Sequence, residues 1–172
     1  MIADSRLKQI RLLLLDVDGV LTDGTIIYSD TGVETKAFNV KDGLGIKLLM
    51  KAGIHAGIIT GRSSPALLKR TRELGITWMF DNVTDKAAVL DHIVSVSGID
   101  TRHMAFIGDD LPDLAPMKRV GLPIAVADAD ETVIELAQIV TTRKGGQGAV
   151  REICEAILKA QDLWGKALNQ FL

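Results

Sequence analysis

Side chains that could carry out phosphoryl transfer follow the apolar runs of this chain. Asp16 and Asp18 stand directly after the first run. The other polar groups follow later runs or open the next helix: Thr60, Gly61, Lys86, Asp109 and Asp113. Converging carboxylates repel one another, and a hard divalent cation relieves the repulsion; ligands that are all oxygen atoms favour Mg²⁺ over zinc. Because a lysine and backbone amides can neutralise the charge of a phosphate, the set predicts phosphoryl transfer.

These side chains meet only if the apolar runs form one sheet. The runs have the length and composition of buried strands and lie at residues 10–15, 54–59, 78–80, 104–107, 122–126 and 138–141. Amphipathic stretches that predict helices alternate with them at residues 43–52, 65–74, 85–96, 112–118, 131–137 and 148–163. This alternation predicts an α/β fold, a doubly wound, Rossmann-like sandwich around a parallel sheet. In such a fold ligands bind outside the carboxyl ends of the strands, where all these polar groups should gather.

One segment departs from the alternation and predicts a β-hairpin. Residues 25–28 and 33–38 flank four residues with strong turn chemistry. Because the hairpin follows the first two aspartates directly, we expect it to stand over the site as a flap, residues 25–38. Ile27 lies on one face of the first hairpin strand and its two apolar neighbours on the other, and an isolated hairpin is marginal in water. We therefore expect a partner surface to support it.

The composition is that of an ordinary globular protein. Of the 172 residues, 47% are hydrophobic and 24% charged, and the net charge of -2 gives no reason to expect nucleic acid or a membrane as a partner. The lone Cys154 cannot form an internal disulfide, which fits a reducing cytoplasm. No apolar run has the length of a signal segment or a membrane span. We expect one cytoplasmic domain over residues 1–172, closed by a helix and tail at 148–172.

The polar clusters, taken in chain order, resemble the four motifs of the haloacid dehalogenase superfamily. The matching residues are DVDGVLTDG at 16–24, TGR at 60–62, Lys86, and GDD followed by Asp113. The resemblance covers essentially the whole chain. It implies that Asp16 is the nucleophile and becomes an aspartyl phosphate, and that Asp18 is the general acid and base. Thr60, Gly61 and Lys86 would then bind the phosphoryl oxygens.

The same resemblance implies a Mg²⁺ cofactor. The side chains of Asp16 and Asp109 and the backbone carbonyl of Asp18 would hold the ion, and Asp113 would support it directly or through water. The intervals between the motifs are too short for a cap domain, so the chain is similar to the capless members of the superfamily.

Further segments resemble one subfamily, the 3-deoxy-D-manno-octulosonate 8-phosphate phosphatases of lipopolysaccharide biosynthesis. They are FNVKDG at 38–43 and KGGQGAVRE at 144–152. This implies a Mg²⁺-dependent phosphomonoesterase acting on that sugar acid phosphate. It also implies a homotetramer, in which hairpins meet around a central axis and a neighbouring subunit completes each site. The apolar tail that contains Trp164 and Phe171 is by default expected to pack on the core of its own chain. The resemblance implies the alternative that it reaches a neighbouring site and gates product release.

The substrate assignment leaves one alternative open, a nine-carbon sialic-type sugar acid 9-phosphate. Phosphatases of that kind tend to carry glutamate after Thr-Gly, where this chain has Arg62. A cation there suits the carboxylate of a sugar acid. We expect Arg62 and Thr22 to bind substrate, and Arg62 favours the eight-carbon acid.

Two other classes fit the sequence less well. A receiver domain of signalling proteins also has a doubly wound sheet, an acidic pair, a threonine and a lysine, and Asp81 could be its phospho-acceptor. Its acidic pair is adjacent, however, and it has no second acidic cluster after the fourth strand. A catalytically silent assembly domain is the third possibility. All motif positions are intact, and this argues against it.

Overall fold

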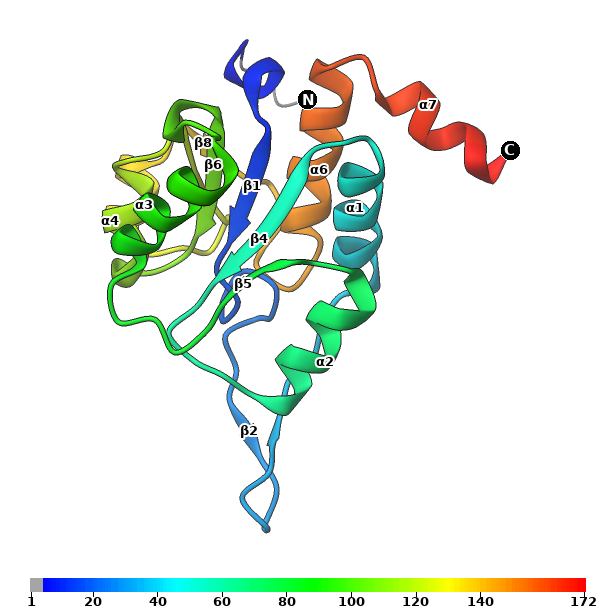
Figure 1. Ribbon diagram of the computed structural model, residues 1–172. Helices are drawn as coiled ribbons and strands as arrows, with labels where there is room; N and C mark the ends of the chain where they lie inside the picture. Colours follow the sequence, from blue (N-terminus) through cyan, green and yellow to red (C-terminus); the bar gives the residue numbers. More distant parts are fainter. Residues whose placement is uncertain (1–4) are drawn as a thin grey trace.

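Six parallel strands form the central sheet of the computed structural model, which describes residues 5–172 (Figure 1). Residues 1–4, part of the amino-terminal stretch considered above, lie outside the described residues. The strands lie in the order β5-β4-β1-β6-β7-β8. Their bounds are β1 Leu12–Leu15, β4 His55–Ile59, β5 Trp78–Phe80, β6 Met104–Gly108, β7 Leu122–Ala125 and β8 Ile139–Val140. Each of the six expected strands is present, and the chain passes outward from β1 to one edge and then to the other.

Helices cover both faces of this sheet, as the alternation predicts (Figure 1). One face packs against α1 (Val40–Lys51), α2 (Pro65–Leu74) and α6 (Ala149–Ala160). The other packs against α3 (Lys86–Ser97), α4 (Leu114–Met117) and α5 (Glu131–Leu136). The side chains of β1 are completely buried and alternate between the two cores. Burial on both faces explains why β1 is a continuous leucine run and not an alternating one.

Three of the predicted helices differ from the observed ones by more than one residue at an end. α1 begins at Val40 and not at residue 43, because the Asn39 side chain caps it by accepting a hydrogen bond from the Lys41 backbone N–H at 2.8 Å. The stretch 112–118 divides into a 3₁₀ turn, η3 (Leu111–Asp113), and α4. The carboxy-terminal helix stops at Ala160 because Asp162 adopts a positive φ of 58°.

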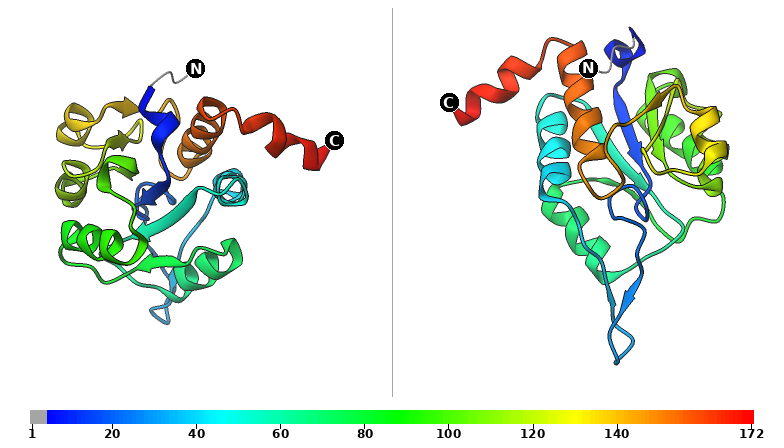
Figure 2. Two further views of the ribbon diagram at one scale, coloured as in Figure 1. Left: turned by 45° about the horizontal axis from the view of Figure 1, so that its top comes forward. Right: turned by 180° about the vertical axis from the view of Figure 1, so that it is seen from behind.

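A separate short helix, α7 (Trp164–Leu168), follows that break and leads away from the domain in both views of Figure 2. Trp164 stays close to α6, where the cationic groups of Arg151 and Lys159 lie 5.6 and 5.1 Å from its ring centroid. Phe171 beyond it is largely exposed. The first part of the tail, with Trp164 and Ala167, therefore packs against the core of its own chain, whereas Phe171 does not.

The hairpin is present but shorter than expected, with strands β2 (Ile27–Tyr28) and β3 (Glu34–Thr35). It extends beyond the carboxyl edge of the sheet (Figure 1). Ile27, Tyr28 and Val33 are 46%, 60% and 61% exposed, so residues 5–172 leave about half of each of these side chains uncovered. No helix between residues 5 and 172 combines the length and apolar character needed to cross a membrane.

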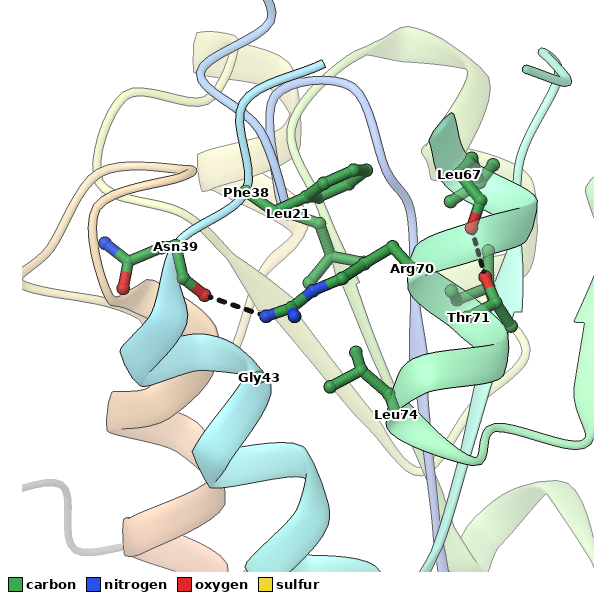
Figure 3. Close-up of a pocket in the computed structure, with 9 residues that line it drawn as sticks. Leu21, Phe38, Asn39, Gly43, Leu67, Arg70, Thr71 and Leu74 are labelled. Atoms are coloured by element: carbon green, nitrogen blue, oxygen red, sulfur yellow. Dashed lines mark hydrogen bonds between the residues drawn. The ribbon is translucent and has the colours of Figure 1, made fainter. Parts of the chain in front are cut away.

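Arg70 joins α2 to the start of α1, beside a small pocket lined by Leu21 and Phe38 (Figure 3). Its guanidinium Nη2 donates a hydrogen bond to the Asn39 carbonyl oxygen at 3.4 Å. Gly43 makes room for this contact, because a Cβ at that position would lie 2.1 Å from Arg70 Nη2. Part of the FNVKDG segment thus serves to pack two helices.

Asp42 ties α1 to α6 across more than a hundred residues of sequence. Its buried carboxylate accepts hydrogen bonds from the backbone N–H of Arg151 at 2.8 Å and of Gly148 at 3.3 Å. These N–H groups belong to the first turn of α6, which has no side-chain cap of its own. A negative charge there also complements the positive end of the helix dipole.

We expect Asp42→Asn to lower the free energy of unfolding by about 1–3 kcal/mol, because an amide can accept from one N–H group but turns its NH₂ toward the other. Urea unfolding of metal-free protein at a fixed concentration measures this. Asp30→Asn, at the exposed hairpin turn, is the matched control and should leave the midpoint unchanged. Equal midpoints for the two variants would contradict the assigned role.

Candidate functional site

Three carboxylates meet at the carboxyl ends of the adjacent strands β1 and β6. Asp16 follows β1, Asp109 follows β6, and Asp113 ends the η3 turn. One oxygen from each lies within 4.8 Å of the others. The expected convergence of motifs one and four is therefore present, since parallel pairing of β1 with β6 brings their ends together.

Lys86 inserts an ammonium group between two of these carboxylates. Its Nζ lies 2.9 Å from Asp16 Oδ1 and 2.7 Å from Asp113 Oδ1, and its side chain is buried. Lys86 is the first residue of α3, whose start is fixed by Asp85: that side chain accepts from the Ala87 and Ala88 backbone N–H groups. The cap thus determines where the lysine enters the site.

The single lysine does not balance the acidic cluster. Burial, together with the charge of Asp113, raises the pKa of Asp16 to about 6 despite the opposing effect of Lys86. Burial and the charges of Asp16 and Asp113 raise the pKa of Asp109 to about 8. Buried carboxylates take up protons when no cation compensates their charge. Asp109 Oδ1 also has no hydrogen-bond partner, so the donor set fits a hard divalent cation.

Two glycines allow the cluster to be this tight. Gly19 has φ +92°, and a Cβ there would lie 1.9 Å from Asp109 Oδ2. A Cβ at Gly108 would lie 2.5 Å from the Cβ of Asp113. Asp113 is further held by accepting the Asp109 backbone N–H at 3.0 Å and by a capping box with Asp110. A side chain at either glycine would push the carboxylates apart.

Thr60 and Gly61 lie at the end of β4, on the other side of β1 from the β6 carboxylates. Thr60 is buried, and its Oγ1 accepts the Arg62 backbone N–H at 3.3 Å. Two backbone hydrogen bonds fix Thr60 next to the loop after β5. Its N–H donates to the Phe80 carbonyl oxygen, and its carbonyl oxygen accepts from the Val83 N–H. The residues of motifs one, two, three and four therefore all reach one edge of the sheet.

Asp18 lies apart from the three clustered carboxylates. Its side chain pairs with Lys36 of the hairpin and, at 3.6 Å, with Arg62 Nε. Glu34 pairs with both cations, at 2.9 Å from Lys36 and 3.0 Å from Arg62, and the hydrogen bond from Lys36 keeps the pKa of Glu34 below its ordinary value. The four side chains form an alternating ring of charges between the hairpin and the loops after β1 and β4.

Sequence reasoning did not identify Lys36 or Glu34 as site residues. The available signal was their spacing: residues two apart on a strand share a face. Charged side chains at 34 and 36 would therefore point together toward the aspartates that precede the hairpin. Burial disfavours the charged form of Lys36, but its hydrogen bonds to Asp18 and Glu34 outweigh this effect and raise its pKa.

Thr22 holds the loop after β1. It is buried, and its hydroxyl accepts the Gly24 backbone N–H at 3.2 Å and contacts the Val17 carbonyl oxygen at 3.4 Å. The loop at 144–148 packs directly on this turn: a Cβ at Gly145 would lie 1.6 Å from the Gly19 carbonyl oxygen. The Gly146 N–H donates to the Val20 carbonyl oxygen at 2.9 Å. The KGGQG segment is thus built for close backbone contact with motif one.

Comparison with known proteins agrees with this geometry. A family model described as haloacid dehalogenase-like hydrolase matches residues 79–153. The chain is 46% identical to the 3-deoxy-D-manno-octulosonate 8-phosphate phosphatase KdsC of Yersinia pestis, over 91% of this chain and 84% of that protein. It is 42% identical to the protein of the same name from Escherichia coli K12, over 96% and 88%.

The corresponding crystal structure from Moraxella catarrhalis, in complex with a magnesium ion, a phosphate ion and a KDO molecule, superposes with a TM-score of 0.94. It is 45% identical, and the match covers 97% of this chain and 96% of that one. The fold and the identity over nearly the full length agree. The chain belongs to the 3-deoxy-D-manno-octulosonate 8-phosphate phosphatase family of haloacid dehalogenase-like hydrolases.

Proposed function

We propose that this chain is a Mg²⁺-dependent phosphomonoesterase that hydrolyses 3-deoxy-D-manno-octulosonate 8-phosphate, in lipopolysaccharide biosynthesis. The observation that carries the proposal is the buried cluster of Asp16, Asp109 and Asp113 with its single lysine. Relatives of the same name at 42–46% identity support the substrate. Residues 1–172 would act as one phosphatase domain.

Asp16 is the nucleophile in this proposal. A carboxylate oxygen of Asp16 attacks phosphorus, and the bond from phosphorus to the sugar oxygen breaks as an aspartyl phosphate forms. Asp18 donates a proton to that leaving oxygen and then takes one from the water that hydrolyses the aspartyl phosphate. Lys86, Thr60 and the Gly61 backbone hold the phosphoryl oxygens and balance their charge.

Mg²⁺ would be held by Asp16, Asp109 and the Asp18 carbonyl, with Asp113 supporting it directly or through water. When bound, the ion lowers the repulsion between the anionic nucleophile and the anionic phosphate. The raised pKa values of Asp16 and Asp109 and the unpartnered Asp109 oxygen support its presence.

Arg62 would bind the substrate's carboxylate, and Thr22 would act on the substrate only through the loop that it holds. The Nε of Arg62 is buried without a hydrogen-bond partner, while Glu34 and Tyr28 occupy its Nη2. A donor without a hydrogen bond close to Asp18 suits a second anionic group on the ligand. The nine-carbon sugar acid phosphate is the alternative substrate.

The active form would be a homotetramer in the cytoplasm. Ile27, Tyr28 and Val33 leave apolar surface on the hairpin that its own chain does not cover. Symmetry-related hairpins could cover one another and place a neighbouring chain at each site. The exposed tail beyond α7 would be free to contact a neighbouring site.

Mg²⁺ binding should strengthen as pH rises. In metal-free protein the pKa values of Asp16 and Asp109 are raised, so the folded state binds more protons than the unfolded state between about pH 4 and about pH 8. The free energy of unfolding therefore falls as pH rises through that range. Because Mg²⁺ requires deprotonated carboxylates, the apparent Kd should be at least roughly tenfold higher at about pH 6 than at about pH 8.5. Calorimetric titration measures this, and Asp109→Asn is the variant that should lose the response. Equal affinity at both pH values would contradict the assignment.

Arg62→Gln should act on the sugar acid more than on simple esters. Removing the cation without adding a negative charge should raise the KM for the octulosonate phosphate by about tenfold, because one charge-assisted hydrogen bond is lost. The KM for p-nitrophenyl phosphate, which has no carboxylate, should change much less. Steady-state kinetics on both esters and on the nine-carbon acid phosphate make the comparison. Equal losses on all esters would assign Arg62 to the phosphate or the fold.

Ile27→Asp should dissociate the assembly and lower activity together, because a charge would be buried between hairpins. Light scattering gives the mass, and activity is measured on the same samples. Val96→Asp, at an exposed apolar position of α3, is the matched control and should preserve both. A fully active wild-type monomer would refute the shared site.

A further inference from the structure

Lys36 is a buried cation of the hairpin that the phosphatase chemistry described above does not use. Its side chain is only 3% exposed although it follows β3 at the outer edge of the domain. Its Nζ donates a hydrogen bond to Asp18 Oδ1 and lies 2.9 Å from Glu34 Oε1. A lysine is seldom buried unless it is paired, so this burial depends on the two carboxylates.

The two oxygens of Asp18 have different surroundings. Oδ1 accepts the hydrogen bond from Lys36, whereas Oδ2 is buried and has no hydrogen-bond partner, with Arg62 Nε 3.6 Å away. A carboxyl group fixed through one oxygen presents the other in a defined direction. Oδ2, which has no hydrogen bond, is therefore the atom able to carry a proton to or from a ligand.

Glu34 holds the lysine in place. Its carboxylate contacts Lys36 through Oε1 and Arg62 through Oε2, at 2.9 and 3.0 Å. Since Glu34 is paired with Tyr28 in the β2–β3 register, the hairpin backbone sets the position of both charges. The orientation of Asp18 thus depends on the hairpin of its own chain.

Resting on the function proposed above, we propose that Lys36 is a positioning residue that orients Asp18 for proton transfer. With Oδ1 held by Lys36, Asp18 Oδ2 gives its proton to the sugar oxygen as the phosphorus–oxygen bond breaks and the Asp16 oxygen–phosphorus bond forms. In the second step Oδ2 takes the proton of the attacking water, and phosphate leaves Asp16. Lys36 itself neither gains nor loses a proton.

The dependence on leaving group separates this role from a structural one. An alkoxide, as in the sugar phosphate, needs protonation when it departs, whereas p-nitrophenolate leaves with little help. Lys36→Met should slow single-turnover formation of the free sugar acid at least about tenfold, within the range of acid catalysis. Single-turnover release of p-nitrophenolate should change by less than about threefold. Lys36→Arg should recover most of the loss, and Lys47→Met, at an exposed position of α1, should match wild type.

If Lys36→Met slowed hydrolysis of both esters equally, the inference would be overturned, and the role of Lys36 would be to stabilise the hairpin. Unchanged rates on both would overturn it as well. The p-nitrophenyl reaction also reports whether the variant folds, because it needs the intact cluster. A wild-type protein that hydrolyses neither ester would overturn the proposed function itself, and this inference with it.

Discussion

Electrostatic repulsion among Asp16, Asp109 and Asp113 is the constraint around which the active edge of this fold is organised. Asp16, Asp109 and Asp113 bring three carboxylate oxygens within 4.8 Å of one another beside one lysine, and burial, together with their repulsion, raises the pKa values of Asp16 and Asp109. The surrounding backbone nevertheless holds them together, through parallel pairing of β1 with β6 and through the turn that fixes Asp113. Such an arrangement is costly in the free protein and becomes favourable when a divalent cation and a phosphate share the site, which is the logic of a metal-dependent phosphatase.

The rest of the structure protects that arrangement by long-range backbone contacts. The glycines of the 144–148 loop pack closely against the turn after β1. Asp42, which lies on α1, accepts hydrogen bonds from backbone N–H groups in the first turn of α6. Asn39 caps α1 and also donates to the Gly146 carbonyl oxygen at 3.3 Å. The two segments that marked the subfamily, 38–43 and 144–152, are therefore in direct contact beside the loop after β1. The hairpin, by contrast, touches the site through charges: Lys36 and Glu34 reach back to Asp18 and Arg62 while its apolar surface faces away.

Much of this was accessible from the sequence because the signals were local and repeated. Continuous apolar runs predicted all six sheet strands, and the helix predicted at residues 65–74 coincides with α2. The meeting of the acidic clusters followed from strand ends alone. Contacts between distant residues could not be predicted in this way. The early start of α1 depends on an asparagine cap inside an otherwise ambiguous stretch, and the break after α6 depends on one residue, Asp162, in a left-handed conformation. The spacing of Glu34 and Lys36 places both on one face of the hairpin, but their pairing with Asp18 also depends on how the hairpin folds back, which the spacing alone does not specify.

Chemical mapping of the phosphorylated residue tests the central claim most directly. Protein quenched during turnover of the sugar acid phosphate is reduced with borohydride, which converts an acyl phosphate on aspartate to homoserine. All tryptic peptides are then sequenced by tandem mass spectrometry, and the peptide of residues 12–36 contains Asp16 and Asp18. The account predicts conversion at Asp16 and loss of the signal, with turnover, in Asp16→Asn. Conversion at Asp81 would indicate receiver-like chemistry. Conversion at Asp18 or Asp109, or steady turnover with no converted aspartate, would equally contradict the assignment of Asp16 as the nucleophile.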